Sequence, residues 1–172
     1  MAARRPGLPD RGMVVAMSAR SGLAIRTVLT VVVVAGLAVD AFVHFDLAAG
    51  YAGVKSSALS QADLFRAEGT VAVIAGLALL VRPRRYTAVF AFLVSAGGTA
   101  AVLLYQYVDV GAFGPLPNMY EPLWFPEKTL SAWAEGVAAL VALALVAAIH
   151  LRARRSTHAA ARLGQRPVRA SD

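Results

Sequence analysis

Residues 85–109, RYTAVFAFLVSAGGTAAVLLYQYVD, contain no charged side chain between Arg85 and Asp109. A helix that crosses the roughly 30 Å hydrocarbon core of a bilayer needs about 20 mostly apolar residues. This stretch meets that length by itself, and it predicts a transmembrane helix over 86–108. The solvent of this part of the chain is therefore expected to be lipid.

Three further apolar blocks have the length of a span, at about 24–46, 63–82 and 130–151. Ser60-Gln-Ala-Asp63 precedes the second block and matches a capping box, a common start of a helix. The sequence therefore predicts an all-α, four-transmembrane-helix bundle over residues 23–151. The flanking segments 1–22 and 152–172 are interpreted as basic tails, the first of them disordered.

The composition agrees with a membrane protein and excludes several functions. Hydrophobic residues make up 58% of the 172 residues and charged residues 16%, whereas a soluble domain has about 25% charged residues. The absence of cysteine excludes disulfide exchange and thiolate metal sites. The net charge of +7 does not indicate nucleic-acid binding, because the basic residues lie between and beyond the apolar blocks.

The distribution of basic residues predicts the orientation in the membrane. Arginines precede the first block, fill the turn at 82–85 and follow the fourth block, whereas the opposite loops hold Lys55 and Lys128. The positive-inside rule then places both termini in the cytoplasm. A cleaved signal peptide in place of the first span is the alternative. Arginines far outnumber the two lysines, which is typical of a high-GC bacterium and indicates a bacterial plasma membrane.

Ionisable side chains inside the spans gather at one depth. At about 1.5 Å per residue, Asp40 lies about 21 Å above Arg26, and Glu68 lies equally far above Arg82. The same arithmetic places His44, Arg66 and Glu135 about 24–27 Å up, so all five share the outer third of the bilayer. Charged groups at such depth are candidates for ligand or proton binding.

Several arrangements can neutralise these acids. Arg66 can pair with Asp40 or Glu135, one acid can hold a proton, His44 can be charged beside Asp40, or a cation can bind. The cluster is either a set of interhelical bonds that fix the bundle or a functional site. A single histidine at this level speaks against a metal site, and His150 lies too far away for a bis-histidine haem, so no metal and no cofactor is predicted.

The outer end of the third span adds another candidate and an unusual loop. Tyr105 ends the span at the level of the acids and can reach them, or it can anchor the helix in the interface. The connection 109–128 is rich in proline and aromatic residues. It is interpreted as an ordered lid over the cluster or as an interfacial anchor.

Small residues at helical spacing predict close packing between the spans or a homodimer. They are Gly36, Ala72, Gly76, Ala91, Ser95, Gly98 and Thr99. Tight approach of the helices leaves little room for a wide aqueous pore, so a channel is disfavoured.

Three short motifs resemble the DoxX-like small membrane proteins of bacteria. They are Phe42-Val-His-Phe45 at the end of the first span, Arg66-Ala-Glu-Gly69 in the second and Ala134-Glu-Gly136 in the fourth. The resemblance covers roughly residues 24–151 and implies a four-helix bundle associated with respiratory or redox-stress complexes. The long proline-rich loop departs from the DoxX pattern and is compatible with a separate family of high-GC bacteria.

Three functions follow as hypotheses. The first is a non-enzymatic accessory or scaffold component that binds a membrane protein partner, since the sequence has no nucleophile–base or phosphate motif. The second is a small carrier or ligand-binding protein that uses the outer acid, histidine and arginine cluster. The third is a subunit of a quinone-linked oxidoreductase, with Tyr105 or His44 as proton relay.

Overall fold

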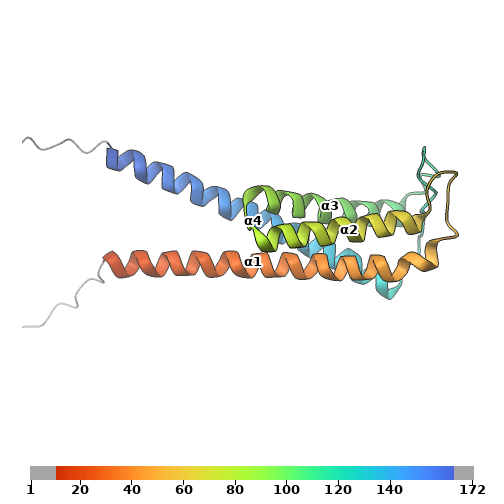
Figure 1. The fold of residues 1–172 in the computed structure, drawn as a ribbon, viewed down its shortest axis with the longest axis horizontal. Helices are drawn as coiled ribbons and strands as arrows, with labels where there is room; N and C mark the ends of the chain where they lie inside the picture. Colours follow the sequence, from red (N-terminus) through yellow and green to blue (C-terminus); the bar gives the residue numbers. More distant parts are fainter. Residues whose placement is uncertain (1–10, 165–172) are drawn as a thin grey trace, which may run out of the picture.

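The computed structural model describes residues 11–164 and shows four long helices (Figure 1). They are α1 (Arg11–Ala48), α2 (Gln61–Val81), α3 (Arg85–Tyr107) and α4 (Pro126–Gly164), with a short 3-10 helix, η1 (Ala49–Tyr51), after α1. Each long helix contains a segment long and apolar enough to cross a bilayer. The prediction of an all-α bundle with four candidate spans is therefore confirmed.

α2 and α3 coincide closely with the second and third predicted spans, whereas α1 and α4 extend beyond the first and fourth. Residues 11–22 and 152–164, predicted as parts of tails, continue these two helices. Alanine, methionine and arginine favour helix, and no proline interrupts either segment. A span prediction detects where apolarity ends, and these helices continue past that point. Residues 1–10 and 165–172 of the predicted tails lie outside the described residues.

The predicted capping box at the start of α2 is confirmed. The Ser60 Oγ accepts a hydrogen bond of 3.2 Å from the Asp63 backbone N–H, and the Asp63 Oδ2 accepts one of 3.0 Å from the Ser60 N–H. These two bonds satisfy groups that a helix N-terminus leaves without intrahelical partners. They fix where the chain turns from the first outer loop into the bundle.

The helices follow one another around the bundle in chain order. α1 packs against α2 and α4, and α3 packs against α4 and more sparsely against α2. Figure 1 shows that the start of α1 and the end of α4 lie at the same end of the bundle, which also holds the turn between α2 and α3. We call this the inner end, because the arginines gather there, and the opposite end the outer end.

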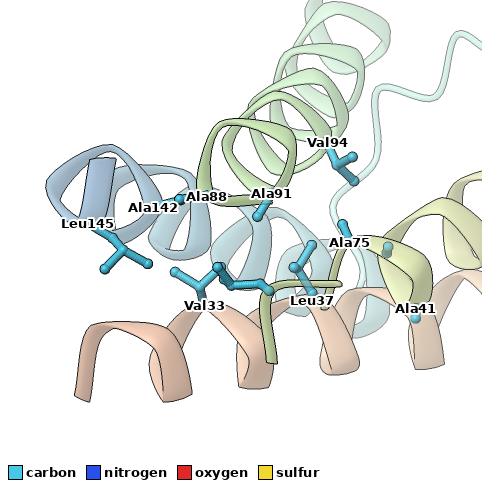
Figure 2. Close-up of a cluster of buried hydrophobic side chains, with 11 residues drawn as sticks. Val33, Leu37, Ala41, Ala75, Ala88, Ala91, Val94, Ala142 and Leu145 are labelled. Carbon is cyan, nitrogen blue, oxygen red and sulfur yellow. The ribbon is translucent and has the colours of Figure 1, made fainter. Parts of the chain in front are cut away.

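The core of the inner half is made of small and branched apolar side chains. Figure 2 shows Val33 and Leu37 of α1 facing Ala91 of α3 and Leu145 of α4. Alanine at many of these positions lets the helix backbones approach closely, as the small-residue spacing predicts. At Gly36 an added Cβ would lie 2.9 Å from the Ala134 carbonyl oxygen, so α1 and α4 touch almost backbone to backbone.

The other small residues of the predicted packing set lie at helix contacts or beside them. Ala72, Ala91 and Ser95 are fully buried, Gly76 and Gly98 are buried, and Gly36 and Thr99 are partly buried. Large apolar side chains such as Leu140 and Leu93 are exposed on the outside of the bundle. An apolar exterior around a small-residue interior is the arrangement that a bilayer requires.

The loop between α3 and α4 is tied to the helices by hydrogen bonds. The Gln106 Nε2 donates to the Pro122 carbonyl at 2.6 Å, and the Glu121 N–H donates to the Tyr105 carbonyl at 3.0 Å. The Ser56 Oγ, in the other outer loop, donates to the Pro115 carbonyl at 2.7 Å. The two outer loops therefore form one connected cover over the outer end of the bundle.

Candidate functional site

A cluster of polar side chains is buried between α1 and α4, at the outer side of the apolar core. Asp40 is 0% exposed, Glu135 1%, Ser131 3% and His44 8%. Asp40 and His44 are one turn apart on α1, and Ser131 and Glu135 are one turn apart on α4, so each pair lies on one helix face. We call these four residues the buried cluster.

Hydrogen bonds connect the two helices through this cluster. The Ser131 Oγ donates to the Asp40 Oδ1 at 3.0 Å and lies 3.2 Å from the Glu135 Oε1. The His44 Nδ1 lies 2.8 Å from the Asp40 Oδ1 and 3.0 Å from the Asp40 carbonyl oxygen. The His44 ring also packs edge-on against Phe65 of α2, with ring centroids 5.2 Å apart.

Two carboxylate oxygens of the cluster lack a partner among the described residues. They are the Asp40 Oδ2 and the Glu135 Oε2, both in side chains that are almost completely buried. A hydroxyl has a single hydrogen, so Ser131 can donate to Asp40 or to Glu135 but not to both. Burying acids without full compensation is costly, so the cluster needs either a proton on one acid or a further positive partner.

α3 makes room for the cluster at Gly98. A Cβ added there would lie 2.7 Å from the carboxyl carbon of Glu135, closer than side chains pack in proteins. Any residue other than glycine would displace the acid from its position. Gly98, a member of the predicted packing set, therefore leaves the space that the Glu135 side chain occupies.

A cavity of about 450 Å³ adjoins the cluster between the outer halves of α1, α2 and α3. Such a volume lies within the usual range of small-molecule sites. Its walls are mostly apolar, and they include polar side chains at several points. The polar residues that line it are His44, Tyr51, Gln61, Glu68, Tyr105, Glu121, Lys128 and Ser131.

Small residues of α2 and α3 line the cavity, and these two helices pack more sparsely than the other neighbouring pairs. Ala67 of α2 and Gly97, Gly98 and Ala101 of α3 line it, and a Cβ at Gly97 would meet no atom within 4 Å. The outer halves of these two helices are therefore separated by a cavity and not by packed side chains. His44 and Ser131 line the cavity and belong to the buried cluster, so the two features are continuous.

The α3–α4 loop covers the outer end of this cavity. Leu116, Met119, Glu121 and Phe125 of that loop and its junction with α4 line the cavity. The Lys128 Nζ, at the start of α4, donates to the Glu121 carbonyl and lies 5.5 Å from the centre of the Trp124 ring. The loop thus has the position of a lid, one of the two interpretations of its proline and aromatic content.

The structure separates the predicted site residues into three groups. Asp40, His44 and Glu135 meet in the buried cluster. Glu68 and Tyr105 line the cavity, and the Glu68 Oε1 has no partner among the described residues. Arg66 lies elsewhere: its guanidinium is 3.4 Å from Asp63, and both side chains are more than half exposed.

The position of Arg66 follows from helix geometry. Successive residues are about 100° apart around a helix, so Arg66 and Glu68 differ by about 200° and point in nearly opposite directions. Arg66 was grouped with the acids because it lies at the same depth in the bilayer. Depth in the bilayer does not say to which side of the helix a side chain points. Arg66 therefore does not provide the compensating charge that pairing with Asp40 or Glu135 would supply.

Sequence reasoning missed Ser131, Gln61 and Lys128. Ser131 carries a recognisable signal, since it precedes Glu135 by one turn and must share its helix face. In the sequence, Lys128 serves only as one of the few basic residues of the outer loops. Its contact with the α3–α4 loop depends on how that loop folds. A single serine or glutamine near a helix end has no comparable signal in one sequence.

No family model, no curated protein and no solved structure matches this chain.

Proposed function

We propose that this integral membrane protein binds a small lipid-soluble molecule with a polar end in the cavity between α2 and α3. The observation that carries the proposal is the continuity of the cavity with the buried cluster through His44 and Ser131. Apolar walls would hold the body of the ligand, and the polar groups would orient its head. This is the ligand-binding function among the three hypotheses, and it requires no catalysis by this chain.

The chemistry of the lining favours a ligand with a carbonyl or hydroxyl group. His44, Ser131 and Tyr105 offer hydrogen-bond donors and acceptors. Lys128 and Glu121 lie at the lid end, and Lys128 is held to the loop, so the polar groups are distributed over both ends of the cavity. A wholly apolar ligand would make no use of the donors and acceptors that these side chains keep in addition to their bonds within the protein.

A quinone is the second candidate, because His44 and Tyr105 line the same cavity. Both side chains can exchange protons with a quinone carbonyl. The DoxX-like resemblance points in the same direction, toward a subunit of a quinone-linked oxidoreductase. Such a subunit needs a partner protein that carries the redox centre.

The accessory or scaffold role is compatible with ligand binding and concerns a different surface. Large aromatic side chains are exposed on the outside of the bundle, among them Trp133 and Phe42, and Phe113 is exposed in the α3–α4 loop. They contact lipid, and they offer a surface to a membrane protein partner or to a second copy of the chain. We place the protein in a bacterial plasma membrane, with the inner end in the cytoplasm, on the charge distribution.

Thermal stability of the purified protein tests the ligand-binding proposal. Menaquinone and ubiquinone analogues, fatty alcohols and fatty acids are added to the protein in detergent. A molecule that binds the folded protein stabilises it by about 2.7 kcal/mol at a concentration 100 times its Kd. We expect at least one class to raise the melting temperature.

Two neighbouring substitutions separate the cavity from the lipid surface. Ala101 lines the cavity and Ala100 does not, although both are exposed on α3. Ala101→Trp is expected to abolish the shift and Ala100→Trp to keep it. Equal shifts in both variants would place the ligand on the outer surface and contradict the proposal.

A further inference from the structure

The buried cluster contains the donor set of a metal site. One donor atom each from Asp40, His44 and Glu135 lies within 4.8 Å of the other two. Asp40 and His44 come from α1 and Glu135 from α4, so three ligands converge from two rigid helices. Sequence reasoning disfavoured a metal because it counted histidines, whereas one imidazole with two carboxylates is also a complete set of three protein ligands.

The unpartnered oxygens point to a ligand within this cluster. The Asp40 Oδ2 and the Glu135 Oε2 have no hydrogen-bond partner among the described residues, in side chains that are 0% and 1% exposed. Buried carboxylates normally accept hydrogen bonds or bind cations. The space that Gly98 leaves for the Glu135 carboxyl keeps this acid in the interior rather than letting it turn toward lipid.

The charges of the surroundings favour a cation. When both are ionised, Asp40 and Glu135 bring two negative charges, and Glu68 adds a third acid beside the cavity. Arg66 is engaged with Asp63 on the exposed surface and does not compensate them. A divalent cation with a neutral imidazole would balance Asp40 and Glu135 completely, whereas a charged His44 would balance one of them.

We propose that Asp40, His44 and Glu135 bind a divalent first-row transition metal ion, with Zn²⁺ as the probe. Imidazole with carboxylate suits such ions, while Mg²⁺ and Ca²⁺ are bound mainly through oxygen ligands. Zinc–ligand distances of about 2.0–2.1 Å place neighbouring ligand atoms about 3.3 Å apart in a tetrahedral site. The proposal requires the three donor atoms to move from within 4.8 Å of one another to this spacing when the metal binds.

The site has a direction in which a fourth ligand can enter. His44 and Ser131 line the cavity, so the cluster forms part of its wall. Zinc sites with three protein ligands keep one position for water or another small ligand. The metal is inferred from the cluster alone, and it binds whether or not the cavity holds the lipid-soluble molecule proposed above.

The test is metal uptake by the purified full-length protein. The protein in detergent is treated with a chelator, Zn²⁺ is titrated by calorimetry, and the bound metal is counted by elemental analysis. We expect about one Zn²⁺ per chain. Asp40→Asn, His44→Gln and Glu135→Gln are each expected to weaken binding at least tenfold.

Matched substitutions outside the cluster control for charge and for stray binding by histidine. Asp46→Asn changes an exposed acid at the same end of α1, and His150→Gln changes a histidine in the inner half of α4. Both variants are expected to bind Zn²⁺ as the wild type does. The proposal would be overturned if the Glu135→Gln variant still bound Zn²⁺ while either control variant had lost it.

X-ray absorption of the zinc-loaded wild type decides the case even if the cluster variants do not fold. The proposal requires a single imidazole among the nearest neighbours of zinc, the rest being oxygen at about 2.0 Å. A site with two or more imidazoles, or with oxygen alone, would overturn it. A wild type that takes up no Zn²⁺ would also overturn it and would leave protons as the compensating charge.

Discussion

Gly98 of α3 faces Glu135 of α4 so closely that a Cβ at position 98 would lie 2.7 Å from the Glu135 carboxyl carbon. The contact joins the helix that lines the cavity to the helix that provides an acid of the buried cluster. A third helix, α1, brings Asp40 and His44 to the same place. The position of Glu135 therefore depends on a hydrogen atom at residue 98.

Gly98→Ala is expected to destabilise the protein by about 1–3 kcal/mol, the usual cost of overpacking, because the added Cβ meets the buried Glu135 carboxyl. Thermal unfolding in detergent measures the change. Gly97→Ala is the control, because a Cβ there meets no atom within 4 Å, and it is expected to be neutral or stabilising. In a Glu135→Ala background the Gly98→Ala substitution is expected to cost nothing, since the clash is gone. An equal cost in both backgrounds would contradict the contact.

Ser131→Ala is expected to destabilise the protein by about 1–3 kcal/mol, because it leaves Asp40 without the hydroxyl that donates to it. Ser95→Ala is the matched control on α3. Ser95 is fully buried, and its hydroxyl makes no hydrogen bond to the described residues. Its removal is expected to change stability little or to raise it. Chemical denaturation of the two variants compares their free energies of unfolding. An equal loss of stability in both would show that the Ser131 hydrogen bond does not stabilise the protein beyond the effect of burying a serine.

Gln106→Glu is expected to loosen the lid. The substitution keeps the size of the side chain and removes the donor that holds the Pro122 carbonyl at 2.6 Å. Hydrogen exchange of the loop 109–125, followed by mass spectrometry, should become faster, while exchange in the helices stays unchanged. Tyr107→Phe, at an exposed neighbouring position, serves as the control. Unchanged exchange in the Gln106→Glu variant would show that other contacts hold the loop.

Single cysteines test the orientation, since the chain contains no cysteine of its own. Ser57→Cys lies in the first outer loop and Pro83→Cys in the turn between α2 and α3, and both positions are exposed. In intact cells a membrane-impermeant thiol reagent is expected to label Ser57→Cys. Pro83→Cys should react after the cells are opened. The reverse pattern would place the arginine-rich end outside and contradict the positive-inside assignment.

Much of the fold could be predicted from the sequence because the bilayer imposes it. An uncharged stretch such as 86–108 has one structural solution in lipid, and α3 spans Arg85–Tyr107. The capping box at Ser60 and Asp63 located the start of α2 for a similarly local reason. The inner extension of α1 was missed, because helix formation does not stop where apolarity stops.

The sequence predicted the depth of the candidate site in the bilayer, but not which side chains contact one another there. Helical rise gave Asp40, His44 and Glu135 a common level, and these three meet. Arg66 shares that level and points away, because direction around a helix depends on phase and on how each helix is rotated in the bundle. The cavity depends on the sparse packing between α2 and α3, which has no local pattern in the sequence.

The most direct test of ligand binding in the cavity is native mass spectrometry of the protein released gently from its own membrane. The account predicts one small lipid-soluble molecule per chain on the wild type and on the Ala100→Trp variant. The Ala101→Trp variant, whose new side chain fills the cavity, should have lost it. Wild-type protein that carries no such molecule, or that carries the bulk phospholipids equally in all three forms, would contradict the account.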